Sequence, residues 1–312
     1  MASKQLLGVM TSLTLLSTVA CGDAKDSNVS GSNGSGGSAQ GGSLVLVPVA
    51  GSATGFGGAG NGAPPGTLPD GFTKVDVGGY QLGEPITSET GTGGGSSSNG
   101  EGCGTVILAL IRDFKSDHPD FEKAVGAETG LVKPTLGDDR KPVFAHDGMT
   151  PTVSGPESFA QWYANVDGVN LPFVLEVFFA PKNGTTSFQS NAFFPLDGAG
   201  FGNENNNHNF HFTTEIHTQF RYNGGEVFNF TGDDDVWIFI NNQLLVDLGG
   251  VHGAQSAMVD MDTKAAEVGI TKGQVYPFDM FQAERHTSES NFRADTNLEF
   301  VDCGTIVPDV PK

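Results

Sequence analysis

The chain has 312 residues, a formal net charge of −20 and a pI near 4.5. Nucleic-acid-binding proteins depend on clustered Lys and Arg, but here 16 basic residues stand against 36 acidic ones, so the composition argues against that role. An acidic surface suits a solvated extracellular protein or one that holds divalent cations.

The first 21 residues have the features of an export signal. Lys4 precedes an apolar run, and small residues precede Cys21, as in a cleaved signal peptide. The segment TVAC resembles a bacterial lipoprotein cleavage box, in which Cys21 becomes the lipidated N-terminus, although Thr18 departs from that pattern. The alternative is an ordinary cleaved signal with an incidental cysteine. We expect a secreted protein of the bacterial cell envelope, anchored through its N-terminal lipid as an outer membrane lipoprotein or at the cell surface.

A glycine-rich segment follows the signal. Residues 22–102 hold 24 of the 45 glycines and many serines, and such a composition cannot bury a core and behaves as a flexible linker. We therefore expect a signal peptide at 1–21, a disordered tether at 22–102, one folded domain at 103–305 and a tail at 306–312.

Two further cysteines, Cys103 and Cys303, lie at the two edges of the expected domain. In an oxidising compartment they would pair and join its ends. Closing a loop of about 200 residues would stabilise the domain by at most about 5 kcal/mol. With Cys21 lipidated as well, no thiol would remain for catalysis or for a zinc site.

Strand patterns dominate the expected domain. Residues 210–222 alternate between apolar and polar side chains, which is typical of a half-buried antiparallel strand. The turn Asn223-Gly224-Gly225 then predicts a hairpin with a strand over 226–232. Further strands are expected at 105–114, 171–181, 236–250 (two strands around Asn241-Asn242), 274–285 and 296–303.

Helical signals are few. Residues 118–130 could form one short helix that ends at Gly126 or Gly130, and a second could begin near Pro156. Many strands with apolar faces and Gly- or Asn-rich turns predict an all-β fold, an antiparallel β-sandwich with long loops and one or two short helices.

Several motifs point to a family. GDDDVWIFIN and ERHTSESNF, with the segments around them, give residues 104–302 a resemblance to the fibro-slime domain family. That family resembles the wider group of β-sandwich modules named after the N-terminal part of anthrax protective antigen, the PA-fourteen modules. Such modules occur in adhesins, toxins, glycosidases and extracellular matrix proteins, so the resemblance implies the fold better than the activity.

The acidic triplet Asp233, Asp234 and Asp235 precedes an apolar strand. In calcium-dependent sugar-binding relatives, two adjacent aspartates joined by a cis peptide bond face one Ca²⁺, which matches Asp233 and Asp234; Asp234 with Asp235 is the alternative pair. The resemblance implies a third ligand at Asn291. Calcium takes six to eight oxygen ligands at about 2.3–2.6 Å and would neutralise the carboxylates. The alternative is a solvated acidic turn.

Three more residues are candidates for ligand binding. Trp237 is a core aromatic or, if its face is exposed, a platform that stacks on a sugar; Asn241 and His286 are the other two. The letters of a hydrolase occur in ERHTSESNF, but they lie on one short loop without a nucleophile elbow, so we expect no enzyme.

These observations predict a calcium-dependent carbohydrate-binding module of adhesion or extracellular matrix, with an extracellular polysaccharide or glycan as partner. One alternative is a structural matrix module in which calcium only rigidifies a loop. The other is a glycoside hydrolase, which needs two carboxylates across a cleft.

Overall fold

The computed structural model describes residues 80–85 and 106–304. The predicted signal peptide, Cys21, Cys103, most of the predicted tether and the tail lie outside the described residues. Within this part of the chain no helix is long and apolar enough to cross a membrane. The elements in chain order are β1 (Tyr80–Pro85), β2 (Val106–Phe114), β3 (Gly126–Ala127), α1 (Pro156–Phe159), β4 (Asn170–Phe178), β5 (Ala180–Lys182), β6 (Thr185–Ser190), β7 (Phe212–Tyr222), β8 (Val227–Gly232), β9 (Asp235–Ile240), β10 (Gln243–Leu248), β11 (Gly250–Val251), β12 (Gln255–Asp260), α2 (Met261–Val268), β13 (Gln274–Glu284), β14 (Phe292–Thr296) and β15 (Glu299–Phe300).

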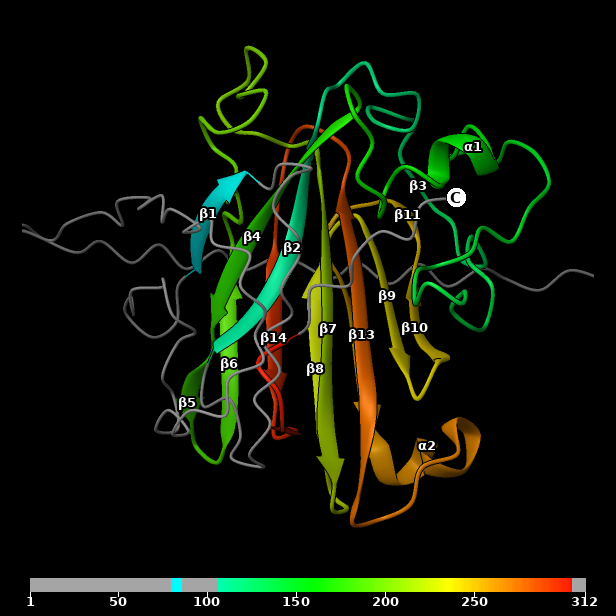
Figure 1. The fold of residues 1–312 in the computed structure, drawn as a ribbon, viewed down its shortest axis with the longest axis vertical. Coiled ribbons are helices and arrows are strands. Elements are labelled where there is room, and N and C mark those ends of the chain that lie inside the picture. Colours follow the sequence, from blue (N-terminus) through cyan, green and yellow to red (C-terminus); the bar gives the residue numbers. More distant parts are fainter. Residues whose placement is uncertain (1–79, 86–105, 305–312) are drawn as a thin grey trace, which may run out of the picture. The chain divides into compact units, whose positions relative to one another are not determined.

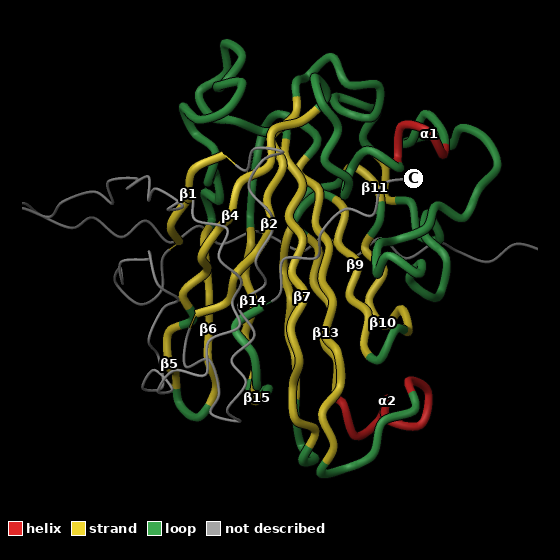
Figure 2. The backbone as a smooth tube through the Cα atoms, viewed as in Figure 1, coloured by secondary structure: helices red, strands yellow, loops and turns green. Residues whose placement is uncertain are grey.

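The described strands form two antiparallel main sheets (Figure 1). The larger has the order β1-β4-β2-β7-β13-β9-β10, with β15 paired to β7, and the smaller has the order β12-β8-β14-β6-β5; β3 and β11 form a separate pair. Long loops extend from the strand ends (Figure 2). The predicted all-β antiparallel fold with two short helices is therefore confirmed.

The main core contains side chains from both sheets. Phe212, Ile216 and Phe220 of β7 belong to the same buried cluster as Phe228 and Phe230 of β8. Aromatic rings pack edge to face within it, an arrangement that aromatic pairs favour. The apolar face predicted for residues 210–222 is thus the inner face of the larger sheet.

The polar face of β7 is also buried, so the prediction of a half-buried strand was wrong. Glu215 and His217 are at most 2% exposed. A second apolar cluster covers the outer face near β9 and β13, where Phe159 and Trp162 from the β2–β4 connection pack with Trp237. Alternation in one strand does not reveal that a distant loop covers its polar side.

The predicted hairpin between residues 210–222 and 226–232 was also wrong. After Asn223-Gly224-Gly225 the chain crosses to the other sheet, where β8 pairs with β12 and β14. The Glu226 carboxylate accepts N–H bonds from Asn223 and Gly224, both at 2.7 Å. This closes the turn through a side chain instead of through a ladder between β7 and β8.

The tether prediction missed one strand. Residues 80–85 form β1, which pairs with β4 at the edge of the larger sheet. The ring of Tyr80 contacts the rings of Phe188 and Phe193, and Leu82 is fully buried. The domain therefore includes residues that precede the predicted boundary at residue 103.

Some of the predicted helices and turns are present in the structure and others are not. The helix expected near Pro156 exists as α1, and Asn241-Asn242 form the predicted β9–β10 turn with positive φ values of 49° and 65°. The helix expected over 118–130 was wrong, because Glu122 has a φ of 53° and extends its carboxylate to His211. The helix α2 was missed, although Asp260 caps its start and Gly269 ends it.

Cys303 lies beside the start of β2. Its carbonyl oxygen accepts the Leu108 N–H at 2.7 Å, and the residue is disulfide-bonded. Because Cys103 lies outside the described residues, the Cys103–Cys303 pairing stays a prediction.

We expect the mature protein to contain no free thiol in Cys103 or Cys303 under non-reducing conditions. Cys303→Ser should lower the free energy of unfolding by up to about 5 kcal/mol, because the closed loop is long. Thiol labelling of the exported protein tests the pairing, and labelling of both cysteines before reduction would contradict it.

The outer face of β7 carries a buried charge network. His217 lies between Asp279 (Nδ1–Oδ1 2.5 Å) and Glu215 (Nε2–Oε1 2.7 Å), and Glu215 also pairs with Arg112 at 2.6 Å and with Lys141. Burial alone would lower the pKa of His217, but its hydrogen bonds to Asp279 and Glu215 outweigh burial and raise it.

This network predicts that His217→Gln lowers the free energy of unfolding by an amount that depends on pH. Because the folded-state pKa lies above the unfolded value of about 6.5, the stabilisation by protonated His217 is complete below about pH 6.5 and is lost as the pH rises through the folded-state pKa. At pH 5.5 the substitution should cost about 3 kcal/mol, which corresponds to about 6–12 °C in melting temperature. The cost should shrink at pH 9. The exposed His146→Gln is the matched control, and a cost that did not change with pH would contradict the assignment.

Candidate functional site

The acidic triplet lies between the end of β8 and the start of β9, and all three side chains are buried. Asp233, Asp234 and Asp235 are 2%, 4% and 0% exposed. The alternative of a solvated acidic turn was therefore wrong. The Asp233–Asp234 peptide bond is cis, as the family resemblance implies for this pair.

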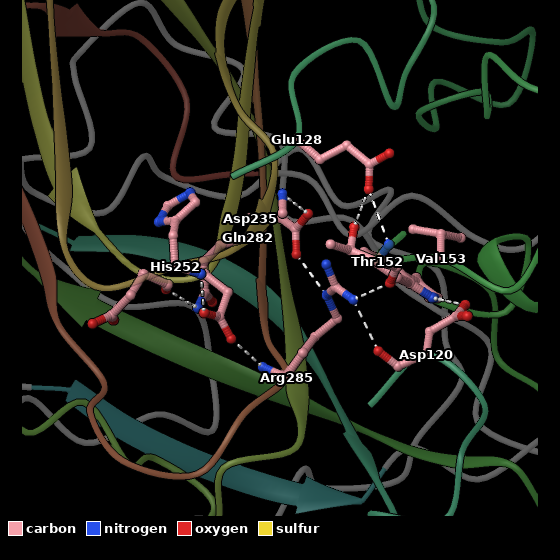
Figure 3. A network of polar contacts seen from close by, with 12 residues as sticks. Asp120, Glu128, Thr152, Val153, Asp235, His252, Gln282 and Arg285 are labelled. Carbon is pink, nitrogen blue, oxygen red and sulfur yellow. Dashed lines mark hydrogen bonds and ion pairs between the residues drawn. The ribbon is translucent and has the colours of Figure 1, made fainter. Parts of the chain in front are cut away.

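Asp235 is neutralised by an arginine. Its Oδ2 accepts a hydrogen bond from Arg285 Nε at 2.6 Å, and its Oδ1 accepts the Gly250 N–H at 2.6 Å. Both partners of the ion pair are fully buried, and Figure 3 shows the Arg285 side chain pointing toward Asp235. This engagement favours Asp233 with Asp234, and not Asp234 with Asp235, as the candidate metal pair.

Arg285 also fastens the β2–β4 connection to the sheet. Its Nη1 donates to the carbonyl oxygens of Asp120 and Thr152 at 2.8 and 2.7 Å (Figure 3), and its guanidinium carbon lies 4.5 Å from the centre of the Trp162 ring. The carboxylate, the two carbonyl oxygens and the aromatic face compensate most of this buried guanidinium, whose Nη2 has no hydrogen-bond partner among the described residues. Sequence reasoning missed this role, because Asp235 and the two carbonyl groups are distant from Arg285 in the chain.

Asp234 accepts two backbone N–H groups. Its Oδ1 accepts from His252 at 2.9 Å and its Oδ2 accepts from Arg285 at 3.0 Å. Burial, followed by the neighbouring charge of Asp235, raises the pKa of Asp234 to about 7. The two hydrogen bonds fix the orientation of the carboxylate without supplying a full positive charge.

Asp233 and Asn291 lie side by side, as the resemblance implies. The Asn291 backbone N–H donates to Asp233 Oδ1 at 2.5 Å, and Asn291 Nδ2 donates to Oδ2 at 2.8 Å. The amide oxygen of Asn291 is not used in these bonds. Burial raises the pKa of Asp233, and the nearby charge of Glu289 adds to this.

Glu284 is a further buried carboxyl that sequence reasoning did not single out as a site residue. It is 0% exposed, and neither of its oxygens has a hydrogen-bond partner of ordinary geometry, although the Ser290 hydroxyl and the His286 N–H lie close enough to oppose the rise in its pKa. The nearby Ser290 hydroxyl donates to the Phe193 carbonyl oxygen at 2.7 Å. Burial, and then the charges of Asp234 and Asp233, raise the pKa of Glu284 well above its usual value. A second unpartnered oxygen nearby is Oε1 of Gln282, whose Nε2 donates to the Asp233 carbonyl at 3.2 Å.

These groups have the chemistry of a site for a hard cation. Carboxylate, amide and backbone oxygens are the ligands that calcium takes, whereas zinc and copper sites are rich in thiolate or imidazole. No three His, Cys, Asp or Glu side chains among the described residues are grouped as a metal cluster. The protein would therefore supply two carboxylates and the Asn291 amide, with carbonyl or external oxygens to complete the set.

The three predicted ligand-binding residues have different outcomes. Trp237 is fully buried and donates to Asp247 Oδ1 at 3.0 Å, so it cannot stack on a sugar. Asn241 lies at the far end of β9 from the aspartates, where its side chain donates to the Val268 carbonyl. His286 lies near the site: it follows Arg285, and its Nδ1 contacts the Thr287 carbonyl at 2.9 Å.

A family model described as the PA14 domain matches residues 196–311. Among curated proteins, the chain is similar to Protein psiR of Dictyostelium discoideum, with 42% identity over 62% of this chain and 21% of the relative. It is also similar to Protein psiD of the same organism, with 40% identity over 65% of this chain and 43% of the relative. The chain thus spans less than half the length of these two relatives.

Two solved structures are similar to parts of the chain at low identity. A PA14 sugar-binding domain from an RTX adhesin covers 65% of this chain and 99% of its own, with 9% identity and a TM-score of 0.25. The PA14 domain of the MpAFP antifreeze protein covers 66% of this chain and 95% of its own, with 10% identity and a TM-score of 0.27.

We expect Arg285→Met to lower the free energy of unfolding by about 3–5 kcal/mol, because it leaves the Asp235 carboxylate buried without a counter-charge. Thermal denaturation measures this loss. Asp235→Asn in the same chain should recover part of it, since the uncompensated charge is removed. Lys264→Met, which breaks an ion pair whose side chains are 41% and 55% exposed, should cost less than about 1 kcal/mol. If Arg285→Met and Lys264→Met lowered the free energy of unfolding equally, the role assigned to Arg285 would be contradicted.

Proposed function

We propose that the domain is a calcium-dependent carbohydrate-binding module of a secreted or surface-anchored matrix or adhesion protein. The observation that carries the proposal is an imbalance of buried charge. Four carboxyl groups, those of Asp233, Asp234, Asp235 and Glu284, are at most 4% exposed. Among the described residues, Asp235 is the one carboxyl group of these four that forms an ion pair, and its partner is Arg285.

Burying carboxylates without counter-charges is expensive, and proteins relieve this by protonation or by a bound cation. A Ca²⁺ ion held by Asp233, Asp234 and Asn291 would supply two positive charges at this point. The Glu284 carboxyl oxygens and the Gln282 amide oxygen, which have no hydrogen-bond partner of ordinary geometry, support the same assignment, because carboxylate and amide oxygens are ligands that calcium takes. When bound, the ion supplies open coordination positions that sugar hydroxyls can fill.

Neighbouring residues orient the two proposed carboxylate ligands. Backbone N–H groups of His252 and Arg285 orient Asp234, and Asn291 orients Asp233. The match of residues 196–311 to the PA14 domain and the resemblance to sugar-binding relatives support carbohydrate as the ligand. Export and lipidation at Cys21 rest on the signal pattern alone and are part of the proposal.

Calcium should stabilise the folded domain by mass action, RT ln(1 + [Ca²⁺]/Kd), which is about 2.7 kcal/mol at a hundredfold excess over Kd. We expect EDTA to lower the melting temperature by about 5–11 °C relative to calcium. Asp234→Asn removes one charged ligand and should abolish most of the calcium-dependent shift. The exposed Asp138→Asn is the control and should retain it. Identical wild-type melting curves in EDTA and in millimolar calcium would end the metal hypothesis.

A glycan array probed in calcium and in EDTA tests the ligand class. Binding that requires calcium supports the proposed function. A calcium-dependent melting shift without binding to any glycan would instead favour a structural module whose loop calcium rigidifies. Turnover of a chromogenic glycoside would overturn the non-enzymatic assignment.

A further inference from the structure

A pocket of about 540 Å³ opens beside Asn291, and its volume lies within the 300–1,000 Å³ typical of small-molecule sites. Its described walls come from three segments that are distant in sequence: 191–194, 206–210 and 287–291. Because Asn291 both lines the pocket and donates to Asp233, the pocket is next to the candidate cation site.

The side chains that line the pocket are those that recognise hydroxyl groups. They comprise four asparagines, three hydroxyl residues, two phenylalanines, one histidine and one glutamate. Each Asn amide can donate and accept at once, as can each hydroxyl, which matches the donor-and-acceptor character of a sugar hydroxyl. The rings of Phe194 and Phe210 are only 8% and 7% exposed, so they form part of the pocket wall and offer little surface on which a sugar ring could stack.

The charges around the pocket are unfavourable for an anionic ligand. Glu289 is exposed and lines the pocket, and its negative charge contributes to the raised pKa of Asp233. None of the described lining residues is Lys or Arg. The His208 ring is already engaged, because its Nδ1 bonds Asp197 Oδ2 at 2.6 Å and it stacks on Phe194 with centroids 3.9 Å apart.

The proposed calcium ion does not make the surroundings of the pocket positively charged. Its two charges are offset by the carboxylates of Asp233 and Asp234, so the loaded site offers no net positive charge to a second anion. The charge of Glu289 remains and repels a carboxylate or sulfate group placed in the pocket.

We infer that the pocket selects neutral, hydroxyl-rich sugars and discriminates against uronic acids and sulfated sugars, with Glu289 as the specificity-determining residue. This inference rests on the proposed function and narrows its ligand to one chemical class. A matrix protein with this specificity would bind neutral polysaccharide even in a matrix rich in acidic polymers.

The test compares sugars that differ only at C6, where a CH₂OH group is replaced by a carboxylate: the methyl glycosides of glucose and glucuronate, galactose and galacturonate, and mannose and mannuronate. Binding to the full-length chain is measured by titration calorimetry in 1 mM calcium. For any pair that binds, we expect the uronate to bind about tenfold more weakly at low ionic strength. Because exposed charges are screened, the gap should narrow in about 0.5 M salt.

Two variants with the same change in net charge identify the residue responsible. Glu289→Gln should reduce the neutral-to-uronate affinity ratio toward one. Glu267→Gln changes an exposed residue of α2 that pairs with Lys264, and it should leave the ratio unchanged. A uronate that binds as tightly as its neutral partner would overturn the inference, as would equal effects of the two variants.

The outcomes also separate this inference from the proposed function. Calcium-dependent binding of uronates would leave the proposed function standing and overturn the selectivity. Neutral-sugar selectivity that persists in EDTA would support the pocket and count against the calcium role. No binding of any neutral or anionic sugar would overturn both.

Discussion

The buried ion pair between Arg285 and Asp235 joins three parts of the molecule. Asp235 begins β9, Arg285 follows the last residue of β13, and the Arg285 guanidinium also holds carbonyl oxygens of the β2–β4 connection. The pair therefore fixes the end of two neighbouring strands and the loop that covers them. Since the aspartates, Glu284 and Asn291 all lie at or near these strand ends, their mutual positions depend on this one guanidinium.

The three consecutive aspartates at this end of the sheet have two different roles. Asp235 is turned toward Arg285 and is compensated within the protein. Asp233 and Asp234 receive only hydrogen bonds from amides, which orient the two carboxyl groups but supply no counter-charge. A run of like charges is thus tolerable because one member is neutralised internally while the other two remain available to an external cation.

Local patterns in the sequence predict most strands of the larger sheet, because β2, β4, β7, β9, β10 and β13 carry their own apolar or alternating runs. The strands β1, β6 and β12 and nearly all of β14 lie outside the predicted strand ranges. The Asp233–Asp234 pair and its neighbour Asn291 follow from motifs. Other features depend on contacts between distant residues. Nothing near His217 indicates that a loop covers its face, and the turn at 223–225 does not specify which sheet receives β8. The partner of Arg285 lies 50 residues away, and the pocket is assembled from three separate loops, so neither can be read from a local window.

The position of β13 in the sheet also determines when the domain can fold during synthesis. This strand pairs with β7 on one side and β9 on the other, and β9 and β10 are linked to the rest of the larger sheet through it. A chain that grows from its N-terminus makes β13 after every other long strand. The larger sheet consequently stays in two pieces until nearly the whole domain has left the ribosome, and its closure by contacts of large sequence separation is a late, slow event.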